Sequence, residues 1–316
     1  MSIGSCIVLY RMVDWSNFAH SLKSANIYWI FFAYVNMNLD RFFMSYKWYL
    51  LIRGLGVPIK FSSTLKAYYV GAFWSTFLPA SIGADLVRVG WCINEGQSGS
   101  KIVSSVFIER LLGILALGIV ALASLILAIY HYKLKLHSVF GIVLLALVGS
   151  IVIILATFNQ RMHRFIRKIV SYLPVRLGTA IDKVMGSILL FKEKPNLLIL
   201  FLMLSICEQA FPIMSLLLLA KAFSINLPFI WALIGVPLIL VVVRVPISIS
   251  GIGIKEGFYA FVFSLANIPV NQSLLMALTD RVLLLFTAVP GVFWTINGTS
   301  PRPDFSIQSQ DSGLTK

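Results

Sequence analysis

Charged side chains inside long apolar stretches are the residues of this chain whose chemistry most needs an explanation. Glu109 and Arg110 stand side by side in one such stretch, and Asp280 and Arg281 do so in another. A charged group at the centre of a bilayer costs roughly 2.5–3.5 kcal/mol on the insertion scale. We therefore expect these side chains to face the interior of a helical bundle, to form ion pairs or to line water.

Basic residues in and beside these stretches are candidates for contact with an anion, because a guanidinium group binds phosphate through two hydrogen bonds. The candidate anion contacts are Arg88, Arg110, Arg244, Lys255 and Arg281, and their candidate charge partners are Asp85, Glu109, Glu208, Glu256 and Asp280. Adjacent helical residues point about 100° apart, so each member of Glu109-Arg110 should find its partner elsewhere, across the two halves of the chain. The equally weighted alternative for this pair and for Asp280-Arg281 is a buried ion pair that fixes helix register.

Two segments combine charge with residues that break helices, namely residues 77–88 and 244–257. The predicted helix-breaking residues are Pro79, Gly83, Pro246, Gly251 and Gly253. Backbone at membrane depth must be hydrogen-bonded, so such a break is tolerated only where protein or trapped water satisfies it. The helix N-termini that it releases would offer N–H donors to an anion. The density of breakers beside charges in the second segment favours a functional role over a purely structural one.

The composition is that of an integral membrane protein. Of 316 residues, 59% are hydrophobic and 12% are charged, whereas soluble domains have about 25% charged residues. The net charge of +14 is explained better by the excess of Lys and Arg that faces the cytoplasm than by nucleic-acid binding. The three cysteines and four histidines show no spacing typical of a metal site, and we expect neither a metal nor a cofactor.

The hydropathy pattern predicts an all-α, polytopic bundle in the cell (inner) membrane, with one transmembrane domain over residues 1–297. The expected spans are 27–46, 102–130, 138–157, 197–220 and 272–296, with shorter apolar segments at 61–82, 229–243 and 257–268. Residues 1–13 are too short to span. The basic segment 158–196 is expected in the cytoplasm, with 165–170 on a helix at the membrane surface, and Lys47 to Lys66 are also expected there. The tail 298–316 should be disordered.

The two breaks and the charges after them recur at nearly one interval. Pro246 follows Pro79 by 167 positions, and Asp280 follows Glu109 by 171. This predicts two repeats, 27–157 and 197–297. Three crossings between the breaks would place them on opposite sides of the membrane, which gives an inverted repeat like those of many transporters.

The segments 77–88 and 246–257, together with Glu109-Arg110, resemble the lysylphosphatidylglycerol synthase transmembrane, or flippase-like, family over about residues 14–297. The resemblance implies re-entrant helices and a role in moving lipids with anionic or sugar-linked head groups. Two-domain synthases of this family also carry a cytoplasmic aminoacyl transferase domain. The chain ends without one, so we expect no enzymatic activity. Ala84 departs from the family pattern, which often has a second glycine there.

Our leading hypothesis is a translocator of anionic phospholipids or polyprenyl-phosphate-linked lipids, in which Arg88, Arg244, Lys255 and Arg281 bind the phosphate. One alternative is a polyprenyl-phosphate-dependent transferase. Another is an accessory protein that positions lipid- or polysaccharide-synthesis enzymes. The sequence leaves the lipid, the energy source and the oligomeric state open. Lipid movement by the purified protein would separate the first hypothesis from the other two.

Overall fold

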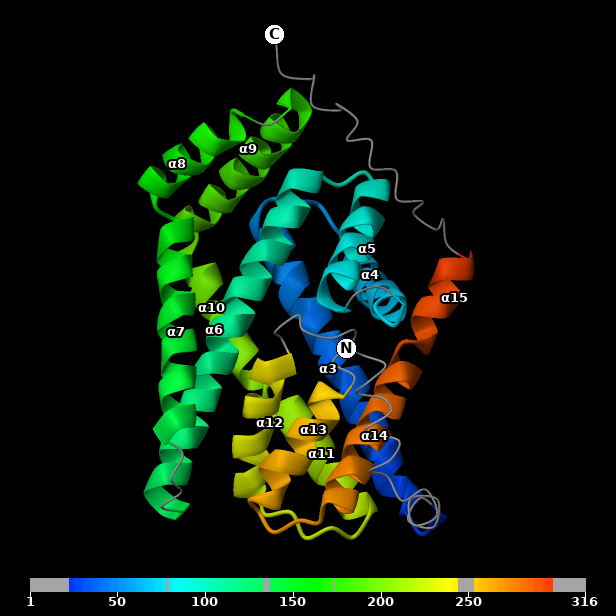
Figure 1. Cartoon of the computed structure of the whole chain (residues 1–316). Coiled ribbons are helices and arrows are strands. Elements are labelled where there is room, and N and C mark those ends of the chain that lie inside the picture. The colour runs from blue at the N-terminus through cyan, green and yellow to red at the C-terminus, as the bar shows by residue number, and fades with distance from the viewer. Residues whose placement is uncertain (1–22, 78–79, 133–136, 173, 244–252, 298–316) are drawn as a thin grey trace.

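The computed structural model describes residues 23–77, 80–132, 137–172, 174–243 and 253–297, and every regular element within them is a helix (Figure 1). In this part of the chain four helices are long and apolar enough to cross a membrane. They are Gly99–Tyr130, Val139–Thr157, Pro195–Ala222 and Val270–Ile296, and Phe229–Val241 is a shorter apolar helix. The predicted all-α polytopic bundle is confirmed. The predictions for residues 1–13 and for the tail lie outside the described residues.

The first half of the chain folds into a long helix, two short helices and a second long helix. These are α3 (Ile27–Gly54), α4 (Phe61–Trp74), α5 (Ala80–Asn94) and α6 (Gly99–Tyr132). Asn26 caps α3 by accepting a hydrogen bond from the amide of Tyr28 at 3.1 Å. At 1.5 Å per residue α3 is about 42 Å long, while α4 is about 21 Å, too short for a hydrocarbon core of about 30 Å. The predicted first span, 27–46, is therefore only part of α3.

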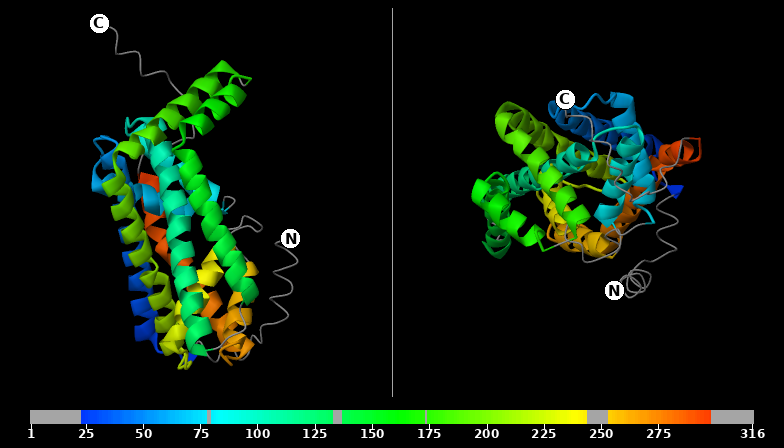
Figure 2. Two further views of the ribbon diagram at one scale, coloured as in Figure 1. Left: turned by 90° about the vertical axis from the view of Figure 1, so that its left-hand side faces the viewer. Right: turned by 90° about the horizontal axis from the view of Figure 1, so that it is seen from above.

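The middle of the chain forms one crossing and a helical hairpin. The elements are α7 (His137–Thr157), α8 (Gln160–Val170), α9 (Val175–Leu189) and the short 3₁₀ helix Leu190–Glu193. The hairpin projects from one end of the bundle (Figure 2), and the hydroxyl of Ser104 ties α6 to it by donating to the carbonyl of Val184 at 2.9 Å. On α8 the apolar side chains of Met162, Phe165 and Ile169 are exposed. The predicted surface helix is thus part of α8.

The second half repeats the order of the first. It consists of α10 (Pro195–Glu208), α11 (Ala210–Ala222), α12 (Phe229–Val243), α13 (Ile254–Ser264), α14 (Val270–Thr287) and α15 (Val289–Asn297). α10 and α11 meet at Gln209, three residues before Pro212. Because proline has no amide hydrogen, the carbonyl of Glu208 loses its helical donor, and such a position is a usual cause of a helix break. The other long helix of this half is also divided, since α14 and α15 meet at Ala288.

The turns of the two halves have matching backbones. Gly56 after α3 and Ser224 after α11 are 168 positions apart and both have positive φ, 73° and 55°. Gly96 after α5 and Asn267 after α13 are 171 positions apart, with φ of 79° and 58°. In all four turns the next residue donates its amide to the carbonyl five positions earlier, at 2.8 to 3.4 Å. We propose α3–α6 and α10–α15 as the two copies of a repeated unit, with α7–α9 between them.

The two pairs of short helices enter the bundle from opposite ends. Figure 1 shows α4 and α5 in its upper half and α12 and α13 in its lower half. Three crossings, α6, α7 and α10–α11, lie between these pairs along the chain. This is the arrangement expected of an inverted repeat with two re-entrant segments.

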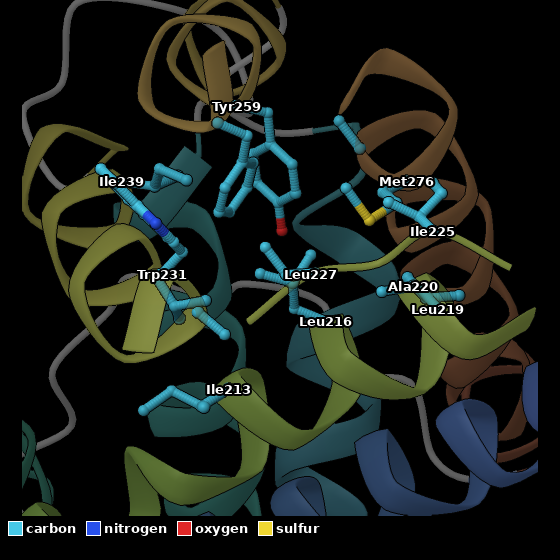
Figure 3. Close-up of a cluster of buried hydrophobic side chains, with 14 of the residues drawn as sticks. Ile213, Leu216, Leu219, Ala220, Ile225, Leu227, Trp231, Ile239, Tyr259 and Met276 are labelled. Atoms are coloured by element: carbon cyan, nitrogen blue, oxygen red, sulfur yellow. The ribbon is translucent and has the colours of Figure 1, made fainter. Parts of the chain in front are cut away.

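Each pair of short helices has its own buried core. The core of the second half, drawn in Figure 3, includes Ile213, Leu216, Trp231, Ile239, Tyr259 and Met276. In the first half a Cβ atom at Gly71 of α4 would lie 2.9 Å from the carbonyl oxygen of Ala84 of α5. Only glycine permits this approach, and small residues at contacts are the usual means of close helix packing within membranes. The close packing of α4 and α5 fixes the position of the charges that follow.

Candidate functional site

Four charged residues of α5 and α6 form one network, here called the α5–α6 cluster: Asp85, Arg88, Glu109 and Arg110. The Nη2 atom of Arg88 lies 2.7 Å from Oδ1 of Asp85 and 2.8 Å from Oε2 of Glu109. Arg110 binds the second oxygen of Asp85 through Nε. The hydroxyl of Tyr68 on α4 donates to Glu109. Two acids and two arginines thus neutralise one another inside the bundle.

The two arginines of this cluster differ in their surroundings. The guanidinium carbon of Arg88 lies 4.8 Å from the ring centroids of both Trp48 and Tyr68. Arg88 is held by two carboxylates and two aromatic rings, and its side chain is 7% exposed. The side chain of Arg110 is 42% exposed. Arg88 therefore organises the cluster, whereas Arg110 presents its charge outward.

A second group, the α13–α14 cluster, consists of two ion pairs formed by Lys255, Glu256, Asp280 and Arg281. Lys255 pairs with Asp280, and Nε of Arg281 lies 2.6 Å from Oε1 of Glu256. The other oxygen of Glu256 accepts a hydrogen bond of 2.8 Å from the amide of Gly253, which has a φ of 86° and caps α13. Glu256 is 1% exposed. One buried carboxylate thus starts the helix and holds an arginine.

The two clusters occupy equivalent places in the two halves. In each, a carboxylate near the start of a short helix binds the arginine 25 positions later, Asp85 with Arg110 and Glu256 with Arg281. Glu109 and Asp280 each lie ten residues after the first residue of α6 and of α14. Ten residues of helix rise about 15 Å, half of a hydrocarbon core of about 30 Å. Both clusters therefore lie at the same distance from the start of a long apolar helix, one in each half.

The structure agrees with the prediction that Glu109 and Arg110 do not pair with each other, nor Asp280 with Arg281. The expectation of partners across the two halves is wrong for these residues, because each short helix is joined to the next by a tight turn and packs against it. Gly83 lies inside α5, which begins at Ala80, so it does not break the helix. Gly253 does mark a helix start. Pro79, Arg244, Pro246 and Gly251 lie outside the described residues.

Glu208 belongs to neither cluster. It pairs with Lys47 of α3, which is 3% exposed and also donates to Ser205 at 3.0 Å. The prediction that Lys47 lies in a cytoplasmic basic region is therefore wrong, because α3 continues past the expected end of the span and buries this residue. Asp40 was not assigned to the site, yet its Oδ1 atom is buried without a hydrogen-bond partner. The sequence spacing could have indicated that Asp40 and Lys47 are buried, because both lie on the same face of α3 as Asn36.

Comparison with known proteins gives one finding. The family model described as "Lysylphosphatidylglycerol synthase TM region" matches residues 2–291. No curated protein and no solved structure gives a significant match to the chain.

Proposed function

The chain belongs to the family of lysylphosphatidylglycerol synthase transmembrane regions, and from this premise we propose that it binds lipids with anionic or sugar-linked head groups and moves them between leaflets. The family itself indicates a multi-pass membrane protein of lipid metabolism or transport. We place the protein in the cell (inner) membrane, with lipids as its partners and lipid- or polysaccharide-synthesis enzymes as further ones.

The observation that supports this proposal best is the pair of equivalent charge clusters, each ten residues into a long apolar helix. Anionic head groups need positive charge there, since crossing the hydrocarbon core unpaired is costly. In each cluster an arginine is paired with a carboxylate that a lipid phosphate could replace, Asp85 at Arg110 and Glu256 at Arg281. A phosphate can bind a guanidinium through two hydrogen bonds, as a carboxylate does. The exchange then leaves no arginine unpaired.

The two clusters suit successive contacts with one head group. The α5–α6 cluster lies between helices that enter from one end of the bundle, and the α13–α14 cluster between helices that enter from the other (Figure 1). A head group that leaves Arg110 would find Arg281 at a similar depth in the opposite half. Arg88 and Lys255 keep the clusters assembled, and Arg244 stays a predicted contact.

The test is lipid movement in liposomes that contain the purified protein. Vesicles of phosphatidylcholine with labelled phosphatidylglycerol report transfer between leaflets, and Arg110→Ala and Arg281→Ala should each reduce its rate at least tenfold. The control is Arg167→Ala, which removes an arginine of α8 whose side chain is 68% exposed and pairs with Asp182 at 3.3 Å. Transfer at the wild-type rate in both cluster variants, with normal folding, would contradict the proposed role of the arginines.

A further inference from the structure

One face of α3 meets the joint between α10 and α11. Asn36, Asp40, Phe43 and Lys47 follow one another by four, three and four positions, which places them on the same face of the helix. The phenyl ring of Phe43 lies 5.5 Å, centroid to centroid, from that of Phe211. The face that carries Asp40 is therefore the one that packs against the divided helix α10–α11.

Hydrogen bonds fix this contact on both sides of Asp40. Toward the start of α3, the amide nitrogen of Asn36 donates to the carbonyl of Phe211 and to the hydroxyl of Ser215, both at 2.8 Å. Toward its end, Lys47 pairs with Glu208. Since α3 and α10–α11 run in opposite directions (Figure 1), Asp40 comes between these contacts, beside the joint at residues 208–211.

Two oxygen atoms at this level have no hydrogen-bond donor among the described residues. One is Oδ1 of Asp40, and the other is Oε1 of Gln209, the joint residue, which is 4% exposed. Both are acceptors, and a buried acceptor without a donor costs about 1–3 kcal/mol, more for a charged group. A proton on Asp40 supplies a donor and removes the charge at once.

The repeat shows why Asp40 differs from its counterpart. The interval of 168 positions, which relates the turns after α3 and α11, also relates Asp40 to Glu208. It relates Lys47, which neutralises Glu208, to Ser215, which is uncharged. Glu208 thus forms an ion pair with Lys47, whereas the equivalent Asp40 forms no ion pair among the described residues. Asp40 lies near the midpoint of α3, and Glu208 lies near the midpoint of α10–α11. Each is about 20 Å from the first residue of its helix.

The other charges around Asp40 do not replace a proton. Arg41 and Lys47, on the same helix, are close enough to attract its carboxylate, but Arg41 points about 100° away from Asp40 and Lys47 is paired with Glu208. From the elements packed on α3, α10 contributes Glu208, α4 contributes Tyr69, bonded to Asn38 at 3.0 Å, and α14 contributes Asp280 and Arg281. The last two are engaged with α13, and α6 contributes the α5–α6 cluster. No ion pair of Asp40 occurs in the described part of the chain.

We propose that Asp40 is a proton-binding site at the middle of the membrane, holding a proton between α3 and the α10–α11 joint. Loss of that proton would leave a carboxylate beside another buried acceptor, so α3 and the joint would separate or admit water. The protonated state follows from the burial of Asp40 and the lack of a donor among the described residues. The use of this proton as the energy source of lipid movement rests on the proposed function.

Infrared difference spectroscopy of the full chain in lipid nanodiscs tests the site without any lipid movement. The C=O stretch of a protonated carboxyl group should be present at neutral pH, disappear in Asp40→Asn and shift in Asp40→Glu. The matched control is Asp182→Asn, which alters a carboxylate of α9 whose side chain is 40% exposed and should leave the band unchanged. Circular dichroism shows whether each variant is folded. If Asp40→Asn does not fold, the shift of the band in Asp40→Glu still tests the assignment.

Absence of the band from the wild-type protein, or its persistence in Asp40→Asn, would overturn the proposal. Loss of the band when sodium replaces choline in the buffer would also overturn it, since the site would then hold a metal cation. A protein that shows the band but moves no lipid would refute the proposed function and still support the proton site. The two proposals can therefore fail separately.

Discussion

Glu256 offers the sharpest test of the cluster geometry, because one buried carboxylate caps α13 and binds Arg281. Glu256→Ala removes both interactions. Breaking a buried pair by deleting one partner costs roughly 3–5 kcal/mol, and losing a helix cap costs about 1 kcal/mol. We expect a loss of about 4–6 kcal/mol in the free energy of unfolding, since Glu256 is 1% exposed and the side chain of Arg281 is only 21% exposed, so that solvent screens this pair weakly.

A double-mutant cycle separates the two contributions. In Glu256→Ala with Arg281→Ala no arginine is left unpaired, so most of the pair penalty should disappear and mainly the cap loss should remain. Glu256→Gln keeps an acceptor for the amide of Gly253 and should cost less than the alanine variant. Reversible unfolding in mixed micelles, followed by circular dichroism, gives these free energies. Asp182→Ala, at an exposed pair, should change stability by less than about 1 kcal/mol.

The reasoning would be refuted if Glu256→Ala were as stable as the wild-type protein. It would also be refuted if the losses of the two single variants simply added in the double variant, because additive losses would mean that Glu256 and Arg281 do not interact.

Two further predictions, one for the contact of α4 with α5 and one for the α5–α6 cluster, use the same unfolding measurement. Gly71→Ala should cost roughly 1–3 kcal/mol by overpacking, since the new Cβ atom would meet the Ala84 carbonyl, whereas Gly90→Ala, with nothing within 4 Å, should be neutral or slightly stabilising. Equal effects would refute the close approach of α4 and α5. Arg88→Lys should cost roughly 1–3 kcal/mol, because an ammonium group cannot bridge two carboxylates and stack on two rings at once, whereas Arg167→Lys on the exposed face of α8 should change stability by less than about 0.5 kcal/mol. A tolerated lysine at position 88 would show that the guanidinium geometry is not required.

Much of the charge arrangement follows from sequence spacing alone. Glu109 and Asp280 lie ten residues into apolar helices, so their distance from the helix start follows from the rise per residue. Gly253 could be recognised as a helix start from Gly251 before it and from Glu256 at the third helical position. These features are local, and local geometry is what a sequence pattern encodes most directly.

Other features depend on contacts that a single sequence does not display. Lys47 has the spacing of a buried residue, but it lies beyond the apolar part of α3, and hydropathy places it outside the membrane. Its burial depends on Glu208, 161 positions away. Likewise, the enclosure of Arg88 by Trp48 and Tyr68 requires three helices to be in place. The choice of partner within a half, and not across halves, depends on the tight turns.

That choice has a consequence for any motion between the halves. The pairs of Arg110 with Asp85 and of Arg281 with Glu256 each lie within one half, so tilting one half against the other breaks neither. The contacts of α3 with α10 and α11 that do join the halves, such as Lys47 with Glu208 and Asn36 with Ser215, lie outside both clusters. A rocking motion can therefore change access to the clusters while leaving both assembled. Asp40 lies on the face of α3 that packs on the α10–α11 joint, so we expect it to respond to such a tilt.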